Sequence, residues 1–499
     1  MEPPAPPQPP TSQPTRTILT IVLTVAVLGY LWMLRQHTSP FAGGSDSSGY
    51  LNSAALVRAG KLFAPVRALP GHAADEFGPH VLKPLGFNPG PAAGLMVPTY
   101  PIGLPLHLAA LSPVAGLDWA TLPLNMITAL AAGGLMYALA RQLRLSVPLA
   151  LGGAALLLVS PQFLFSATQP MSDLLSLVWS LATLSAALRA RENRRWALAT
   201  GFALSVAVLI RPTNLLLLGP IALAFGKNGP RYLWAALGGL PGALLLAYYN
   251  QRVNGSFLAT GYGAVGALFS REFFAANVPH FARWIPGLLS PLAVAALGVP
   301  FVPELRERTT AVLALWVALL TGFYACYFHS GEAWWYLRFI LPAFPAILLL
   351  ALAVAQSAAA RTRQPGAWLA ALLAGALAWE CAMNQRLDIF QYKSAETTYP
   401  EAASWAREHL PHDAVIASMQ VSGAFYYYTD FLIVRWDYVD ATNVAPLLRA
   451  LRESHRPLYA VLYDHEQAEA RQRLPGTWTK LTRIRHATIW RVEPAPDSP

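Results

Sequence analysis

The sequence predicts a polytopic α-helical membrane protein with a small α/β domain at its C-terminus, and three observations support this fold class. Of the 499 residues, 55% are hydrophobic and only 12% are charged; an average soluble domain carries about 25% charged residues. Long uncharged runs recur up to Met383, after which the charge rises and the runs stop. This composition excludes a disordered chain, a coiled coil and an ordinary nucleic-acid-binding domain, and it argues against a soluble multidomain enzyme.

The N-terminal region contains a polar tail and then a first membrane span. Residues 1–15 are rich in Pro, Gln, Ser and Thr and are predicted to be a disordered cytoplasmic tail. The uncharged run Ile18–Leu34 lies between Arg16 and Arg35. A signal peptide is the alternative, but this run is longer than a usual h-region and no small-residue cleavage site follows closely. We therefore expect a retained first span, which opens a transmembrane domain over residues 16–383.

Ten further apolar runs bring the predicted number of spans to eleven. They are Ala120–Ala140, Val147–Ala167, Met171–Leu188, Ala197–Ile210, Leu215–Phe225, Tyr232–Tyr249, Ile285–Val302, Thr310–Phe328, Leu337–Val354 and Trp368–Met383. The two runs beside Arg211 are short, because a bilayer core needs about 20 apolar residues per helix, so the alternative joins them into one helix.

The positions of the basic residues favour eleven spans. With the N-terminus inside, the short outer loops hold almost no Lys or Arg, and joining the two short runs would move Arg306, Arg308, Arg361 and Arg363 outside. The positive-inside rule therefore predicts a cytoplasmic N-terminus and a periplasmic C-terminus. The net charge of +10 reflects this topology rather than nucleic-acid binding.

Three segments face outward in this topology. The first, residues 36–118, contains Leu51–Val57 and the Pro-rich Ile102–Leu111, for which we expect an interfacial or re-entrant helix. In the second, Ser270–Trp284 alternates aromatic and basic residues, as expected of a helix in the headgroup plane. The third, residues 384–499, is predicted to be a periplasmic α/β domain. Its expected strands are Ala414–Ala417, Phe431–Trp436, Leu458–Tyr463 and Thr488–Val492, and its expected helices are Pro400–Arg407 and Val444–Arg452.

Asp46 is the first acidic residue to weigh, because acidic groups near a bilayer are costly. It lies in Gly43-Gly44-Ser45-Asp46-Ser47-Ser48-Gly49-Tyr50, where glycines allow tight turns beside a ligand. A general base or a metal ligand is one interpretation. The other is a helix N-cap, for which Asp and Ser are preferred.

Five stretches in order resemble the GT-C fold glycosyltransferases. They are similar to the bacterial family 39 group, which is related to protein O-mannosyltransferases and lipid A aminoarabinose transferases. The stretches are DSSGY at 46–50, PTYPIGLP at 98–105, QPMSD at 169–173, RPTN at 211–214 and WWYLRFILP at 334–342. The resemblance covers roughly residues 17–383. Relatives often carry a second acid where this chain has Ser47, and Glu where it has Gln169.

The resemblance implies an enzyme that moves a hexose or pentose from a polyprenyl-phosphate donor to an acceptor outside the membrane, with inversion. Asp46 is then the candidate base or acceptor-orienting residue. Asp173 is expected to reach the same cavity, with a helix N-cap as the alternative. A divalent cation held by Asp46 and Asp173 is left open.

Cationic residues are the candidates for the donor phosphate. Arg338 is expected to clamp it, since guanidinium binds phosphate bidentately, or else to snorkel to the headgroups. Arg211 and Lys83 are further candidates, with a helix break and a solvated loop as their respective alternatives. Tyr50 and Tyr100, in the matching first-loop stretches, are expected to bind substrate. His329 and Glu332 are expected to bind sugar hydroxyls, or to be solvated.

The resulting prediction is a glycosyltransferase of a bacterial inner membrane whose partners are a polyprenyl-phosphate-linked sugar, a glycan, lipid or protein acceptor, and membrane lipids. One alternative is a transporter or flippase of lipid-linked substrates. Transporters tend to show paired broken helices in two similar halves, whereas only one candidate break, near Arg211, is found. The other alternative is a non-catalytic relative, which the missing acid after Asp46 keeps open.

Overall fold

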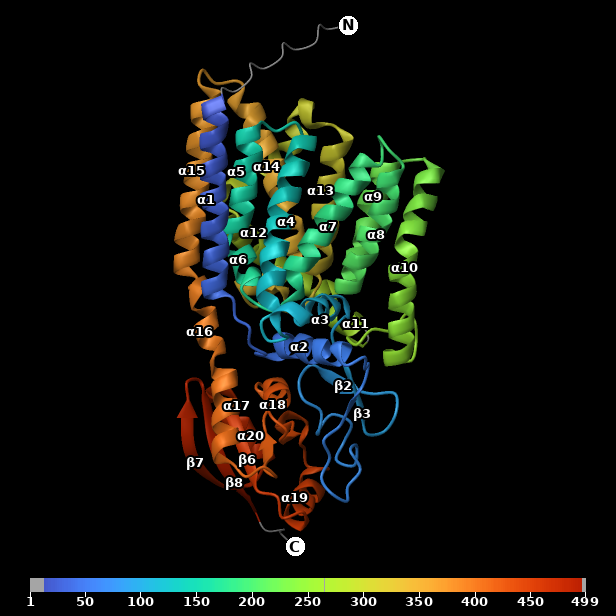
Figure 1. Ribbon diagram of the computed structural model, residues 1–499, viewed down its shortest axis with the longest axis vertical. Helices are drawn as coiled ribbons and strands as arrows, with labels where there is room; N and C mark the ends of the chain where they lie inside the picture. Colours follow the sequence, from blue (N-terminus) through green and yellow to red (C-terminus); the bar gives the residue numbers. More distant parts are fainter. Residues whose placement is uncertain (1–12, 264, 496–499) are drawn as a thin grey trace.

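The computed structural model describes residues 13–263 and 265–495. Long, roughly parallel helices form one end of the molecule, and a domain with strands forms the other (Figure 1). Of the tail predicted to be disordered, residues 1–12 lie outside the described residues and residues 13–15 belong to the first helix. The helices of this bundle are α1 (Gln13–His37), α4 (Thr121–Gln142), α5 (Val147–Val159), α7 (Ser172–Arg189), α8 (Arg195–Ile210), α9 (Leu218–Phe225), α10 (Gly229–Asn254), α13 (Arg308–Ala325), α14 (Phe344–Ala359) and α15 (Pro365–Arg386).

Several of these helices are long and apolar enough to cross a membrane. Five pass this test among the described residues, and counting each of two bent pairs as one span brings the number to seven. The five are Thr121–Gln142, Gly229–Asn254, Arg308–Ala325, Trp334–Ala359 and Pro365–Arg386. The protein is therefore a multi-pass membrane protein, as the sequence predicts, while the number eleven stays a prediction.

Two predicted spans are not single straight helices. The expected span Val147–Ala167 bends by 59° between α5 and α6 (Pro161–Ala167), because Pro161 removes a backbone donor at the junction. The expected span Ile285–Val302 is likewise broken rather than one continuous helix. Here α12 (Phe274–Leu288) and η3 (Pro291–Phe301) meet at 110°.

The chain also breaks after α8, as the sequence predicts. Arg211 is extended, with φ −145° and ψ 115°, and Pro212 opens the 3-10 helix η1 (Pro212–Leu217) that leads into α9. The side-chain amide of Asn214 donates hydrogen bonds to the hydroxyl of Ser176 on α7 (2.9 Å) and to the carbonyl of Ala207 (2.8 Å). These bonds fix the break, and with it Arg211, against α7.

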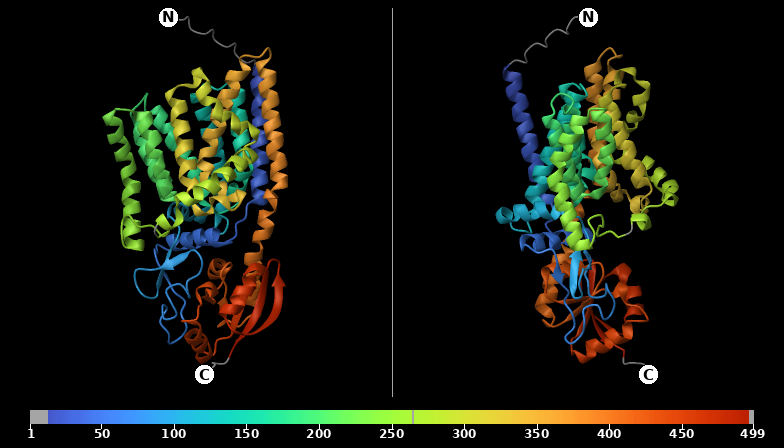
Figure 2. Two further views of the ribbon diagram at one scale, coloured as in Figure 1. Left: turned by 180° about the vertical axis from the view of Figure 1, so that it is seen from behind. Right: turned by 90° about the vertical axis from the view of Figure 1, so that its right-hand side faces the viewer.

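Two helices from the first outer segment run across the end of the bundle (Figures 1 and 2). They are α2 (Ser45–Arg58) and α3 (Gly103–Ala115). The chain between these two helices forms a small antiparallel sheet in the order β1-β3-β2. Its strands are β1 (Ala64–Pro65), β2 (Phe87–Pro89) and β3 (Leu95–Pro98).

Short helical segments connect the remaining elements. Helix α12, with η2, covers the predicted helix Ser270–Trp284, and its place in a headgroup plane stays a prediction. The segments are α11 (Val265–Leu268), η2 (Arg271–Phe273), η4 (Pro303–Leu305), η5 (Phe328–Gly331), η6 (Trp334–Ala343), η7 (Ile389–Gln391) and α16 (Tyr392–Glu396). Of these, η6 continues into α14, and η7 and α16 join α15 to the C-terminal elements.

The C-terminal residues form a five-stranded mixed sheet in the order β5-β4-β6-β8-β7. Strand β4 is parallel to β5 and β6, whereas β8 is antiparallel to β6 and β7. The elements are α17 (Thr398–His409), β4 (Val415–Ala417), α18 (Ser422–Tyr428), β5 (Leu432–Val434), η8 (Trp436–Tyr438), α19 (Val444–Glu453), β6 (Leu458–Tyr463), η9 (Asp464–Glu466), α20 (Gln467–Arg473), β7 (Gly476–Ile484) and β8 (Ala487–Pro494). Each of the four predicted strands overlaps an observed one; β7 was not predicted.

Alternate residues of this sheet bury two separate cores, as strand periodicity requires. Ile416 packs with α17 and α18, whereas Val415 packs on the opposite face. That opposite face also buries Phe77 and Val81 of the first outer segment, and the Val81 carbonyl accepts a hydrogen bond from the backbone N–H of Arg435 (2.7 Å). The first outer segment and the C-terminal sheet are thereby packed into one unit beneath the bundle.

Candidate active site

A cavity of about 680 Å³ lies where the bundle, α2 and the C-terminal elements meet. Its wall includes Asp46 of α2, Asp173 of α7, Arg211 and Arg338 of η6. These four residues come from separate segments: Asp46 and Asp173 lie in the first turns of their helices, Arg211 lies at the break after α8, and Arg338 lies within η6. The fold therefore brings two carboxylates and two guanidinium groups from four segments to one cavity.

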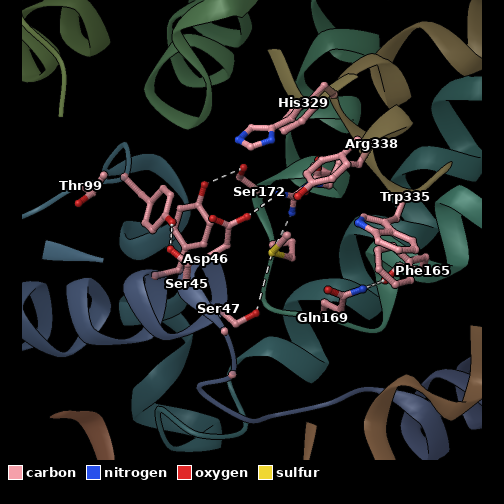
Figure 3. Close-up of a pocket in the computed structure, with 18 of the residues that line it drawn as sticks. Ser45, Asp46, Ser47, Thr99, Phe165, Gln169, Ser172, His329, Trp335 and Arg338 are labelled. Carbon is pink, nitrogen blue, oxygen red and sulfur yellow. Dashed lines mark hydrogen bonds and ion pairs between the residues drawn. The ribbon is translucent and has the colours of Figure 1, made fainter. Parts of the chain in front are cut away.

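Asp46 and Arg338 form one ion pair of this cavity. The Arg338 Nη2 atom donates to Asp46 Oδ2 at 2.6 Å, and Figure 3 shows the two side chains pointing toward each other. The Arg338 guanidinium also lies 5.0 Å from the ring centre of Phe339. The side chain of Asp46 is 27% exposed and that of Arg338 is 12% exposed. Arg338 is therefore held inside the protein by a carboxylate and an aromatic face.

The surroundings of Asp46 keep its carboxylate ionised. Burial by itself would raise the pKa of Asp46, but the charge of Arg338 and hydrogen bonds from Tyr100 and Arg338 outweigh it, so the pKa lies below its ordinary value. The side chain is a carboxylate at neutral pH and a weak base. Its contacts place Asp46 to orient Arg338, and the general-base role predicted from the sequence stays a prediction.

Asp173 and Arg211 form the second ion pair. The Arg211 Nη2 atom donates to Asp173 Oδ1 at 2.6 Å, and Arg211 Nε donates to the hydroxyl of Ser172 at 3.1 Å. Ser172 Oγ also accepts a hydrogen bond from Tyr50 Oη at 2.9 Å. The Asp173 side chain is only 1% exposed. This network ties α2 to α7 and to the break after α8.

Local sequence accounts for these positions. Met171 is extended and α7 starts at Ser172, so Asp173 lies in the first turn of the helix, where the helix dipole favours a carboxylate. Gly44 has a φ of +51° immediately before α2, a conformation that glycine adopts without steric cost. This turn directs the chain so that Asp46 enters the first turn of α2.

Tyr50 and Tyr100 form an aromatic wall of the cavity. Their ring centres are 4.9 Å apart, and Tyr100 Oη shares a 2.6 Å hydrogen bond with Ser45 Oγ. Burial and the nearby carboxylate of Asp46 raise the pKa of Tyr100 well above its ordinary value. Both tyrosines are therefore neutral hydrogen-bonding groups beside the ion pairs.

His329 lines the cavity, but Glu332 does not. His329 Nδ1 and Glu332 Oε1 are 2.8 Å apart, and both side chains are at least one-third exposed. The ring of His329 stacks on Tyr336, with centres 5.2 Å apart and planes at 13°. Of this pair, only His329 is therefore placed to meet a bound sugar directly.

The structure does not bring Lys83 to the cavity. Its side chain is 1% exposed, and its ammonium group is bound by Asp75 and by the carbonyl of Pro79. Lys83 is thus a buried structural cation of the first outer segment, not the solvated residue or the phosphate ligand that the sequence suggested. Its hydrogen-bonding capacity is used inside its own loop.

Sequence reasoning missed the cavity residues that follow the last long helix. They are Tyr392, Glu396, Tyr399 and Gln420. No motif surrounds them, and the one available signal was the position of Glu396 in the short connection between α15 and the C-terminal sheet. The contact between Glu396 and Gly43 arises only from the three-dimensional packing of the chain.

The carboxylates do not fit a divalent-cation site. Asp46 and Asp173 are each bound by an arginine, and no group of three His, Cys, Asp or Glu side chains arranged for a metal occurs in the described part of the chain. A metal would need further oxygen ligands.

Comparison with known proteins identifies the architecture. No protein-family model matches the sequence, and no curated protein matches it significantly. Solved structures do match. The structure of ArnT from Cupriavidus metallidurans bound to undecaprenyl phosphate superposes with a TM-score of 0.62, covering 96% of this chain and 98% of that chain at 13% identity. The chain has the GT-C fold.

Two further GT-C structures agree with this assignment. The oligosaccharyltransferase AglB from Archaeoglobus fulgidus, in complex with an inhibitory peptide and a dolichol-phosphate, has a TM-score of 0.58 at 12% identity and covers 98% of this chain and 75% of its own. The arabinofuranosyltransferase AftD from Mycobacteria has a TM-score of 0.52 at 14% identity and covers 95% of this chain and 42% of its own. The GT-C fold predicted from five short stretches is confirmed.

Proposed function

We propose that the protein is a glycosyltransferase that moves a sugar from a polyprenyl-phosphate donor to an acceptor. The observation that carries the proposal is the cavity at the end of the bundle, where two arginines and two carboxylates meet. The GT-C neighbours support it, because the ArnT structure holds undecaprenyl phosphate and the AglB structure holds a dolichol-phosphate.

Arg211 and Arg338 are proposed to bind the donor phosphate. Arg211 Nη1 and Arg338 Nε are buried and have no hydrogen-bond partner among the described residues. A buried donor without a partner is costly, so each guanidinium keeps capacity for one more acceptor. Phosphate oxygens match the fork of a guanidinium group. Two such groups would stabilise the negative charge that develops on the leaving phosphate.

Asp46 and Asp173 are proposed to hold these arginines in the productive geometry. Each carboxylate is bound by one guanidinium at 2.6 Å. Tyr50, Tyr100 and His329, which line the same cavity, are proposed to bind the sugar. The reaction is proposed to be a direct displacement of the phosphate by an acceptor hydroxyl, which inverts the anomeric centre.

The cavity is proposed to lie on the outer face of a bacterial inner membrane. Most basic residues between the helices lie at the end of the bundle away from the cavity: Arg189, Arg191, Arg231 and Arg308 line a second hollow in the loops predicted to be cytoplasmic. A periplasm-dependent reporter fused after Pro499 is expected to be active, and one fused to the loop at Arg363 inactive. The opposite pattern would contradict this topology.

The proposed reaction is tested with the purified protein in lipid nanodiscs. Synthetic polyprenyl-phosphate sugars carrying a hexose or a pentose are supplied with a glycolipid or glycan acceptor, and release of polyprenyl phosphate is followed together with the glycosylated product. Stoichiometric release and product formation are expected with at least one sugar. Movement of an intact lipid-linked sugar between leaflets without any cleavage would contradict the proposal and support a flippase.

A further inference from the structure

The cavity contains a third carboxylate, that of Glu396. Glu396 ends α16, the connector between α15 and the C-terminal elements, and its side chain lines the cavity. Its carboxylate abuts the backbone of Gly43, where a Cβ atom would overlap Glu396 Oε2. Gly43 precedes Asp46 by three residues, which span at most about 10 Å. Glu396 and Asp46 line the same cavity, and Gly43 links their positions along the chain.

The surroundings of Glu396 differ from those of the other two carboxylates. Asp46 and Asp173 are bound by guanidinium groups, whereas Glu396 has no ion pair within residues 13–263 and 265–495. The titratable groups that face Glu396 are the phenols of Tyr392, Tyr399, Tyr428 and Tyr463. Tyr392 Oη donates a hydrogen bond to the carboxylate, and the adjacent Lys393 turns away to the carbonyl of Gln36 at 3.0 Å.

We propose that Glu396 is the catalytic base that accepts the proton of the acceptor hydroxyl. This inference rests on the proposed glycosyl transfer and adds a catalytic residue to it. The acceptor oxygen forms the new bond to the anomeric carbon, and the bond from that carbon to the phosphate oxygen breaks. The phosphate leaves with the bonding electrons toward Arg211 and Arg338, and the proton passes to Glu396. Charge is conserved, and no further reactant is needed.

Basicity separates Glu396 from Asp46. Burial raises the pKa of Glu396 to about 7, and the hydrogen bond from Tyr392 lowers it only in part. A carboxylate is a better proton acceptor when its pKa lies near the working pH. The pKa of Asp46 is instead held below its ordinary value. The three carboxylates of the cavity thus have different roles: Asp46 and Asp173 orient the arginines, and Glu396 accepts the proton.

This division sets the sign of the pH dependence. Glu396 must be ionised to accept a proton, so kcat/KM is expected to fall about tenfold per pH unit below about pH 7 and to level off above it. The four tyrosines stay neutral in this range because burial raises their pKa values. His329 also lines the cavity and is therefore replaced by Gln in a parallel variant, in which the low-pH limb is expected to persist.

The test compares Glu396→Gln with Glu408→Gln, the same change at an exposed position on α17. Transfer by E396Q is expected to drop about 100-fold or more at pH 8 and to lose the low-pH limb, whereas E408Q keeps wild-type behaviour. An E396Q protein that is as active as wild type, or that retains the limb, would overturn this inference alone. A wild-type protein that transfers no sugar would overturn the proposed function as well.

Gly43→Ala supplies a second, independent variant. The added Cβ would displace the Glu396 carboxylate, so transfer is expected to fall in G43A to a similar extent as in E396Q. Since both changes act on one group, the double variant is expected to be no worse than E396Q alone. Losses that multiply in the double variant would contradict the assignment, because they would mean that Gly43 and Glu396 act separately.

Discussion

Replacement of Arg338 by alanine is expected to reduce sugar transfer by about 100- to 1000-fold, the range seen when one pre-organised donor is removed from a developing anion. The guanidinium lies within the cavity wall, is held by Asp46 at 2.6 Å and keeps its Nε atom free of partners among the described residues. Steady-state transfer rates and the affinity for undecaprenyl phosphate measure the effect. Both are expected to fall.

Two further variants sharpen this prediction. Arg338→Lys keeps the charge but loses the planar fork, so it is expected to restore only part of the activity. Arg363→Ala, in an exposed loop at the far end of the bundle, is the matched control and is expected to behave as wild type. If R338A bound undecaprenyl phosphate as tightly as wild type, the phosphate-binding role of Arg338 would be contradicted and its role would be structural only.

Replacement of Asp173 by alanine is expected to destabilise the protein by about 3–5 kcal/mol, because it leaves the Arg211 guanidinium buried without its carboxylate. Asp173 is 1% exposed and Arg211 is 12% exposed, so water reaches the pair poorly. The free energy of unfolding in mixed micelles, or the midpoint of thermal unfolding in detergent, measures the loss.

A second substitution separates the charge from the packing. Arg211→Met in the Asp173→Ala background removes the uncompensated charge and is expected to recover much of the stability while transfer stays absent. Glu401→Ala is the control, since its ion pair with Arg485 is more than 40% exposed on both sides and is expected to contribute at most about 1 kcal/mol. Equal losses in D173A and E401A would contradict the burial argument.

The sequence allowed the two arginines and two aspartates to be singled out because charged groups at the edges of apolar runs are expensive. It did not allow their pairing to be predicted. Asp46 faces Arg338 and Asp173 faces Arg211 only because α2 crosses the end of the bundle and η1 is tied to α7. Asp46 and Arg338 are 292 residues apart in the sequence, and Asp173 and Arg211 are 38 residues apart. Contacts between residues so far apart depend on how the helices pack, which no local sequence pattern encodes.

Other residues show where local reasoning fails. Lys83 was predicted to bind phosphate or to be solvated, but Asp75 and the Pro79 carbonyl bind its side chain inside its own loop. Glu396 has no motif around it and becomes a site residue only through contact with Gly43.

The sequence did not predict strand β7 or the break within Ile285–Val302, and the residues of each explain why. Strand β7 is mostly exposed and carries too many polar residues to read as a buried strand. In the run Ile285–Val302, Ser290 adopts a φ of +61° before Pro291, and a positive φ at a non-glycine residue cannot be predicted from hydropathy.

An experimental structure of the protein with undecaprenyl phosphate tests the central claim most directly. Phosphate density is expected within hydrogen-bond distance of both Arg211 and Arg338, in the cavity that the carboxylate of Glu396 also lines. Phosphate bound at the arginines of the far end of the bundle, with the cavity beside Asp46 left to solvent, would contradict it.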